Sequence, residues 1–285
     1  MYKLIDGKAH SRTIRREVAE RVELFKHNHG KDVGLAVVLI GNNAASQVYV
    51  RNKIKGCEET GIKSYSYNLP EETTQEQAEE LVLSLVENPA IHGILVQLPL
   101  PEHLNSKKLL ALIPESKDVD GFCEQNIGNL CCGRECLVAC TPNGVMQMLK
   151  REGIEIKGKH AVVIGRSIIV GKPMAMLLLN ADATVTVCHS KTVNLKEFCR
   201  SADILVSAIG VAKFVTADMV KEGAVVVDVG MNTDNNGKLC GDVDFENVKD
   251  KCSYITPVPG GVGPMTISML LYNTVLAAER SVDSD

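Results

Sequence analysis

The stretch HAVVIGRSIIVGKP, residues 160–173, decides the fold, because it joins a short apolar run to a turn that carries glycine. HAVVI has the length and β-branched composition of a buried strand, and a helical pattern follows the turn. Gly165 occupies the first position of the dinucleotide-binding glycine fingerprint, whereas Ser167 and Val170 stand at the second and third. Gly171 falls one residue late. Such a turn can hold a pyrophosphate on backbone N–H groups, but two-glycine turns also occur in α/β proteins of other functions.

The segments after this turn repeat the alternation of apolar runs and helical patterns. Further runs of strand length lie at 183–188, 203–209 and 224–230. Strands that alternate with helices form parallel sheets with right-handed crossovers. The four runs therefore predict a doubly wound, Rossmann-like sheet.

The first half of the chain shows the same alternation. The apolar run at 33–40 predicts a strand, a second strand is expected at 63–69, and GILVQLPLP at 93–101 predicts a third that Pro99 and Pro101 end. Helical spacing separates these runs at 44–61 and 73–88. This half is therefore also predicted to be α/β.

The length of 285 residues is about twice that of one typical domain, so two domains with a cleft between them are expected. The periodicity lapses between residues 114 and 144, which suggests a crossing near residue 140. We expect a catalytic domain over 1–140 and a Rossmann-like domain over 141–263. The helix at 264–285 has a wide apolar face, so it is expected to pack back on the first domain and complete it.

Composition narrows the class of partner. Hydrophobic residues make up 45% of the chain and charged residues 23%, which favours a globular protein. The net charge of -4 comes from scattered residues, and aromatic residues are few, which argues against nucleic acid. The first residues show no apolar run long enough for a signal peptide, and no stretch elsewhere reaches the roughly 18 apolar residues that a membrane span needs. We therefore expect a cytoplasmic protein with no membrane partner.

The ten cysteines are expected to be thiols, because a reducing compartment disfavours disulfides. Cysteines as close in sequence as Cys131, Cys132, Cys136 and Cys140 could bind a metal ion. However, CCGRECLVAC lacks the two CxxC pairs that are typical of a zinc site. We expect neither a metal site nor a structural disulfide, and a zinc site remains the alternative.

The end of the second Rossmann strand favours NADP over NAD. NAD-preferring folds place Asp or Glu there to bind the ribose hydroxyls. Here the strand ends in CHSKT, so His189, Ser190 and Lys191 offer donors and positive charge, and Arg166 lies in the glycine turn. These groups would bind a 2′-phosphate rather than repel it. Ordinary solvated surface residues are the alternative for Arg166 and Lys191.

Seven motifs together resemble one family across nearly the whole chain: the bifunctional methylenetetrahydrofolate dehydrogenase/cyclohydrolase enzymes. In the family's order and spacing they are YVRNK (49–53), VQLPLP (96–101), KDVDGF (117–122), TPNG (141–144), GRSIIVGKP (165–173), CHSKT (188–192) and ITPVPGGVGPMT (255–266). The chain departs from the family pattern in the cysteine-rich segment 131–140.

The resemblance implies the residues of the folate site. Lys53 matches the catalytic lysine, Tyr49 the tyrosine that places the folate ring system, Gln97 the glutamine that contacts the lysine, and Asp120 the carboxylate that holds the pterin. Tyr49 and Lys53 are four residues apart and share a helix face, and Gln97 follows a strand at the edge where open α/β sheets bind ligands. These side chains can therefore converge.

For the cofactor, the resemblance implies NADP bound by Gly165, Arg166, Ser167, Ser190 and Met231. Pro259, Gly260 and Gly261 belong to the family segment that closes over cofactor and folate. Because glycine has no side chain, the backbone can approach a flat ligand closely there. A flexible hinge is the alternative reading of this segment.

The implied activity is oxidation of 5,10-methylenetetrahydrofolate by NADP and hydrolysis of the product to 10-formyltetrahydrofolate, both in the cleft between the domains of a homodimer. Two alternatives remain at this point: another NADP-dependent oxidoreductase that shares only the dinucleotide domain, and a non-catalytic dinucleotide-binding sensor. The motifs of the N-terminal half favour the folate enzyme, because a sensor does not need them. Another dehydrogenase would carry its own catalytic histidine, and none of the seven histidines is clearly placed for that role.

Overall fold

The computed structural model describes residues 1–234 and 236–283 and divides the chain into two compact units. Unit 1 comprises Met1–Ser11 and Thr141–Thr266, and unit 2 comprises Arg12–Cys140 and Ile267–Asp285. Each unit is therefore built from two separate stretches of chain. Within the described residues, no helix is long and apolar enough to span a membrane.

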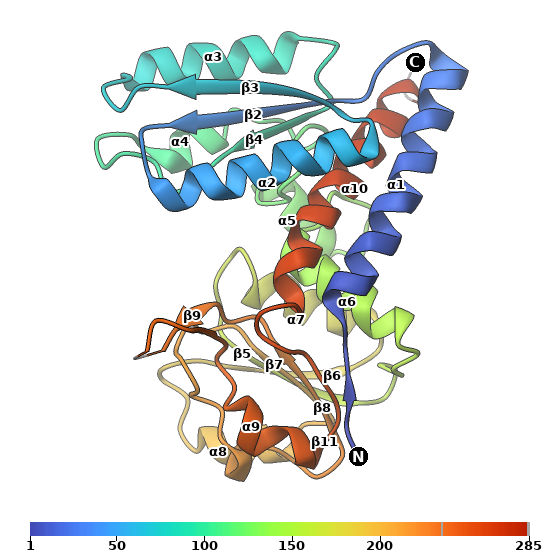
Figure 1. Ribbon diagram of the computed structural model, residues 1–285, viewed down its shortest axis with the longest axis vertical. Coiled ribbons are helices and arrows are strands. Elements are labelled where there is room, and N and C mark those ends of the chain that lie inside the picture. The colour runs from blue at the N-terminus through green and yellow to red at the C-terminus, as the bar shows by residue number, and fades with distance from the viewer. Residues whose placement is uncertain (235, 284–285) are drawn as a thin grey trace. The chain divides into compact units, whose positions relative to one another are not determined.

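Unit 1 contains a parallel sheet of six strands with helices around it (Figure 1). In order of pairing, the strands are β1 (Lys3–Leu4), β11 (Cys252–Ile255), β8 (Ala224–Asp228), β7 (Ile204–Ser207), β5 (His160–Ile164) and β6 (Thr184–Cys188). The other elements that begin in its residues are α1 (Gly7–His29), α7 (Gly171–Asn180), α8 (Leu195–Ser201), α9 (Phe245–Val248), α10 (Val262–Asp283), the hairpin strands β9 (Asn232–Thr233) and β10 (Leu239–Cys240), and 3₁₀ turns at Ala217–Met219 and Lys249–Lys251.

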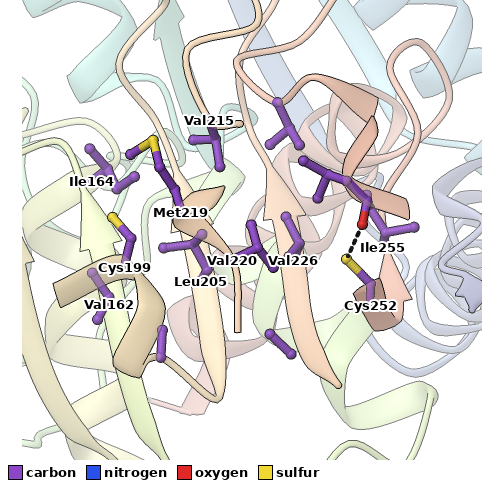
Figure 2. Packing of buried hydrophobic residues seen from close by; sticks show 14 of the residues in the cluster. Val162, Ile164, Cys199, Leu205, Val215, Met219, Val220, Val226, Cys252 and Ile255 are labelled. Atoms are coloured by element: carbon purple, nitrogen blue, oxygen red, sulfur yellow. Dashed lines mark hydrogen bonds between the residues drawn. The ribbon is translucent and has the colours of Figure 1, made fainter. Parts of the chain in front are cut away.

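The core of unit 1 forms because successive side chains of a strand point to opposite faces of the sheet. Figure 2 shows Val162 of β5, Leu205 of β7 and Val226 of β8 in one hydrophobic layer. Cys199 of α8 and Val248 of α9 are buried in the same cluster. Parallel strands covered on both faces are expected to be apolar throughout, and β7 and β8 are buried along their whole length.

Unit 2 contains a three-stranded parallel sheet. Its strands pair in the order β3 (Lys63–Leu69), β2 (Gly34–Ile40), β4 (Gly93–Val96). The helices that begin in this unit are α2 (Ala44–Thr60), α3 (Gln75–Glu87), α4 (Ser106–Leu110), α5 (Glu124–Cys131) and α6 (Cys140–Arg151). In Figure 1, α2 and α3 lie on opposite sides of this sheet.

The helices of unit 2 that flank the sheet have well-defined starts. The side chain of Asn43 accepts a hydrogen bond from the backbone N–H of Ser46 and caps α2. Thr74 and Gln77 form a reciprocal capping box at the start of α3. Such caps satisfy N–H groups that have no partner within the helix, and each stabilises it by about 1 kcal/mol. The cap of α2 fixes the register of the helix that carries Tyr49 and Lys53.

The α/β class and the two-domain organisation are confirmed, but three details differ from the sequence-based expectation. The Rossmann-like sheet has six strands rather than four, because β1 and the short β11 extend it. Residues 1–11 belong to unit 1, since β1 pairs with β11 there. TPNG, at the end of the segment where the periodicity lapses, lies at the start of α6, which is possible because proline is tolerated in the first turn of a helix.

Candidate functional site

Unit 2 brings the amine of Lys53 and the amide of Gln97 into direct contact. The Nζ of Lys53 donates a hydrogen bond of 2.9 Å to the Oε1 of Gln97. The Nε2 of Gln97 donates to the carbonyl oxygen of Leu98 at 2.7 Å, which keeps the amide oxygen turned toward the lysine. The backbone N–H of Gln97 donates to the carbonyl of Val38, so the residue directly continues the ladder between β4 and β2. The sheet therefore positions Gln97, and α2 brings Lys53 to it.

Asp120 lies at the same edge of unit 2. Ile94 of β4 and Asp118 form a parallel bridge, so the chain from Asp118 to Asp120 runs alongside the last residues of β4 toward Gln97. Burial raises the pKa of Asp120 to about 6, while the nearby Lys53 opposes that rise and Asp118 adds to it. The carboxylate and the ammonium group are thus close enough to interact electrostatically.

Tyr49 lies one helical turn before Lys53 on α2 and is 40% exposed. Residues four apart on a helix share a face, so the phenol is on the same side of α2 as the lysine. An exposed aromatic ring beside an amine can stack on a flat ligand while the amine reaches its polar atoms. Three of the four residues predicted for the folate site thus lie together, with Tyr49 on the adjacent turn.

In unit 1, the turn after β5 has the form that a dinucleotide site requires. Gly165 has a φ of 123°, and a Cβ there would lie 2.4 Å from the carbonyl oxygen of Ala208, so only glycine fits. The Oγ of Ser167 accepts hydrogen bonds from the backbone N–H groups of Val170 (3.2 Å) and Gly171 (3.3 Å) at the start of α7. Ser167 thus organises the first turn of the helix, although the glycine fingerprint is incomplete.

The turn after β6 lies next to this one, because Ile164 pairs with Cys188 and the N–H of Gly165 donates to the carbonyl of Cys188. The backbone N–H of His189 donates to the Oγ1 of Thr192 at 2.8 Å, which closes the turn. Arg166, Ser167, Ser190 and Lys191 are exposed on these two turns.

The remaining predicted residues of unit 1 also follow the carboxyl ends of strands. Met231 lies three residues after β8 and is 54% exposed. Pro259, Gly260 and Gly261 lie between β11 and α10, where the carbonyl of Gly260 accepts a hydrogen bond of 3.2 Å from the N–H of Lys8. The cofactor residues predicted from the sequence therefore share one edge of the six-stranded sheet, the edge at which open α/β sheets bind ligands.

These features fit a dinucleotide. The start of α7 presents backbone N–H groups and the positive end of the helix dipole, which together bind a pyrophosphate. At Gly165 the turn lies directly against the backbone of Ala208, so it has no room for a side chain there. The charge and donors on the neighbouring turn suit a phosphate on the ribose.

Comparison with known proteins extends this picture to the whole chain. The profile of the tetrahydrofolate dehydrogenase/cyclohydrolase catalytic domain matches residues 5–120, and that of the family's NAD(P)-binding domain matches residues 139–282. A curated relative, the bifunctional protein FolD of Streptococcus agalactiae, is 56% identical over 99% of both chains. The chain belongs to the tetrahydrofolate dehydrogenase/cyclohydrolase family.

Solved structures agree with this membership of the tetrahydrofolate dehydrogenase/cyclohydrolase family. The bifunctional FolD enzyme of Campylobacter jejuni has a TM-score of 0.96 and 52% identity, covering 99% of this chain and 100% of that one. The FolD of Trypanosoma brucei, solved with NADP and an inhibitor, has a TM-score of 0.93 and 42% identity, with coverage of 99% and 98%. The resemblance drawn from the seven motifs is confirmed, and the two alternative functions lose their support.

Sequence reasoning missed the residues that hold Asp120 in place. The Nδ2 of Asn273 in α10 donates to the carbonyl oxygens of Val119 and Val138, both at 2.8 Å. The buried Asp118 accepts from the Nδ2 of Asn126 at 3.0 Å. Asn273 is 1% exposed, and a polar amide on the apolar face of a helix is the signal in the sequence that could have indicated it.

The cysteines of this family member are all free thiols. Cys131 and Cys132 are exposed at the end of α5, and Cys140 is buried with its Sγ 3.3 Å from the carbonyl oxygen of Val119. Burial, together with the nearby Asp120, raises the pKa of the Cys140 thiol well above its usual range, so it stays protonated. Across residues 1–234 and 236–283, no group of three or more potential ligand side chains is arranged to hold a metal ion.

Proposed function

We propose that the protein oxidises 5,10-methylenetetrahydrofolate to 5,10-methenyltetrahydrofolate with NADP and then hydrolyses that product to 10-formyltetrahydrofolate. The observation that carries this proposal is the contact between Lys53 and Gln97 beside Asp120. It joins an amine, an amide and a carboxylate at one edge of a sheet, and Lys53, Gln97 and Asp120 all lie within the range matched by the catalytic-domain profile. The relatives are named as bifunctional enzymes, which supports the same pair of reactions.

Hydrolysis assigns a proton-transfer role to Lys53. Water that attacks the cationic methenyl carbon must lose a proton, and the ring nitrogen whose bond to that carbon breaks must gain one. The Lys53 amine can take part in both transfers, and Gln97 keeps it oriented through the 2.9 Å hydrogen bond. Asp120 accepts donors of the pterin, and Tyr49 supports the flat ring system.

Oxidation depends mainly on position, because hydride transfer needs the two reacting carbons in contact and no added acid or base. NADP, when bound, supplies the hydride acceptor. The chain's contribution is to bind it: Gly165 and Ser167 at the pyrophosphate, Arg166 and Ser190 at the 2′-phosphate. Met231 contributes through its backbone, and the segment Pro259–Gly261 contacts the folate substrate.

The setting of the enzyme is also a proposal. We place the protein in the cytoplasm, and we propose a homodimer, which the family resemblance supports. The partners are the folate substrate and a second copy of the chain, with no nucleic acid or membrane involved.

The first test is the reaction itself. The purified protein should reduce NADP when 5,10-methylenetetrahydrofolate is added, with a higher kcat/KM for NADP than for NAD. The reason is that the turn after β6 carries Ser190 and Lys191, where NAD enzymes carry a carboxylate. Absorbance of the reduced nicotinamide measures the rate, and equal kcat/KM values for the two cofactors would contradict the preference.

A second test concerns Arg166. The Arg166→Ala variant should raise the KM for NADP about tenfold and change the KM for NAD little, because a hydrogen bond to a charged group contributes about 1.5 kcal/mol or more. Lys157→Ala is a matched control, because Lys157 is an exposed cation that precedes the amino end of β5. An equal loss with both cofactors would show that Arg166 does not contact the 2′-phosphate.

A further inference from the structure

Two buried carboxylates contact each other's chain segments at the carboxyl edge of the six-stranded sheet. Asp228 is the last residue of β8 and is 3% exposed, and Asp242 is completely buried. The Oδ1 of Asp228 accepts hydrogen bonds from the backbone N–H groups of Gly230 and Asp242, both at 2.9 Å, and its Oδ2 accepts from Val243 at 2.8 Å. Asp228 therefore fixes the backbone of the segment that carries Asp242.

Asp242 in turn holds two loops of unit 1 with its side chain. The donors to its carboxylate come from the last residue of β7, from the loop after β7, and from Asn232 in the segment after β8. They are the Oγ of Ser207 (3.1 Å) and the backbone N–H groups of Ile209 (2.8 Å) and Gly210 (3.3 Å) at Oδ2, and the N–H of Val211 (2.9 Å) and the Nδ2 of Asn232 (3.0 Å) at Oδ1. None of these five donors carries a charge. The carboxylate is thus held by oriented dipoles, and it holds their loops in return.

The packing around the two carboxylates is close. A Cβ at Gly230 would lie 2.1 Å from the Oδ1 of Asp242, and a Cβ at Gly241 would lie 1.8 Å from the Oδ2 of Asp228. Both positions therefore require glycine. Gly230 directly precedes Met231, so the Asp242 carboxylate lies against the backbone that presents this residue.

We propose that Asp242 is a positioning residue of the NADP site, which sets the conformation of the loops at 208–211 and 229–232 through these hydrogen bonds. The proposal rests on the proposed function, because it assumes that NADP binds at this edge of the sheet. Loops after the carboxyl ends of parallel strands line the dinucleotide site in such sheets. Asp242 does not touch the cofactor in this account. It fixes the backbone groups that do.

The Asp242→Asn variant tests this proposal, because an amide of the same shape has one acceptor oxygen where the carboxylate has two. Whichever way the amide turns, its NH₂ group faces N–H donors and leaves at least one backbone N–H of these loops unsatisfied. The Kd of the ligand-free protein for NADP, measured by calorimetry, should rise about tenfold or more. The KM for NADP should rise with it, while kcat falls less.

Cyclohydrolase activity, assayed on methenyltetrahydrofolate without NADP, separates positioning from a general loss of structure. Its proposed proton-transfer residue Lys53 and the Gln97 that orients it lie in unit 2, so Asp242→Asn should hydrolyse the substrate at close to the parent rate. Asp244→Asn is the matched control: the same change two residues away, at a carboxylate bonded to Asn247 in α9. It should leave the Kd for NADP unchanged.

A milder variant keeps the proposal open to refutation if Asp242→Asn does not fold. Asn232→Ala removes one donor to Asp242 and should still raise the Kd for NADP severalfold. An unchanged Kd in either folded variant would overturn the proposal, as would a parallel loss of both activities and of thermal stability in Asp242→Asn. If the parent protein itself neither binds nor reduces NADP, the proposed function fails instead.

Discussion

Replacing Lys53 by Met should lower cyclohydrolase turnover by at least ~100-fold, because positioned proton transfer contributes about 10²–10⁴-fold to such reactions. Methionine keeps the length and apolar stem of lysine but has no amine that could accept a proton from the attacking water or donate one to the folate nitrogen. The Oε1 of Gln97 would lose the hydrogen bond of 2.9 Å that it now accepts from the Nζ of Lys53. The measurement is the loss of methenyltetrahydrofolate absorbance, at saturating substrate.

The affinity for NADP should remain unchanged in Lys53→Met, because the proposed cofactor contacts come from unit 1. The dehydrogenase step should fall less than the cyclohydrolase step, since hydride transfer depends on position more than on proton movement. Lys55→Met is the matched control, because Lys55 is an exposed residue of the same helix. Hydrolysis at near the parent rate in a folded Lys53→Met variant would show that the assignment is wrong, and Asp120 would be the next candidate.

Asp120→Asn should raise the KM for folate substrates about 10- to 100-fold, because hydrogen bonds to a charged group contribute roughly 1.5–3 kcal/mol. Asparagine keeps the shape but offers one acceptor and no charge. The fold decrease in kcat should be smaller than the fold increase in KM, since the carboxylate is proposed to hold the pterin rather than to move protons. Steady-state kinetics with both folate substrates measure the effect, and Asp32→Asn, at an exposed carboxylate of unit 2, is the control.

The pH dependence gives Asp120 a separate signature. Burial raises its pKa to about 6, so the carboxyl group is ionised above that pH and gains a proton below it. If the ionised form binds the pterin, the KM of the parent enzyme should rise as the pH falls below about 6. The Asn variant has no group to protonate there, so its KM should stay flat over the same range. The same acid-side rise in both proteins would remove Asp120 from the substrate site.

The central strands of the two sheets were predictable because they are almost entirely apolar. The run at 160–164 is a strand with those same bounds, since it is a buried β-branched stretch followed by a glycine turn. The strand at 63–69 also has the expected bounds, although it is only partly buried. The two-residue β1 was missed, because Lys3 and Leu4 have no periodicity of their own and pair only through tertiary context. Local pattern cannot reveal a strand whose stability comes from its neighbour.

The site was predictable for residues that sit in recognisable motifs and not for those that act through packing. Lys53 and Gln97 come from separate motifs, and the fold brings them within 2.9 Å. Asn273 and Asp242 are distant in sequence from the backbone groups that they bind, and neither lies in one of the seven motifs. Hydrogen bonds between residues 154 positions apart, such as that from Asn273 to Val119, depend on the completed fold.

Because each unit draws on both early and late parts of the chain, the order of synthesis matters for when the enzyme becomes active. The strand β1 is synthesised long before its partner β11, which follows it by about 250 residues. The hydrogen bonds to the carbonyl oxygens of Val119 and Val138 come from Asn273, in the middle of α10. Domains usually fold as they emerge, N-terminal first. Here neither unit can complete its fold before the late residues are made. A nascent chain therefore has no complete folate site until α10 has been released.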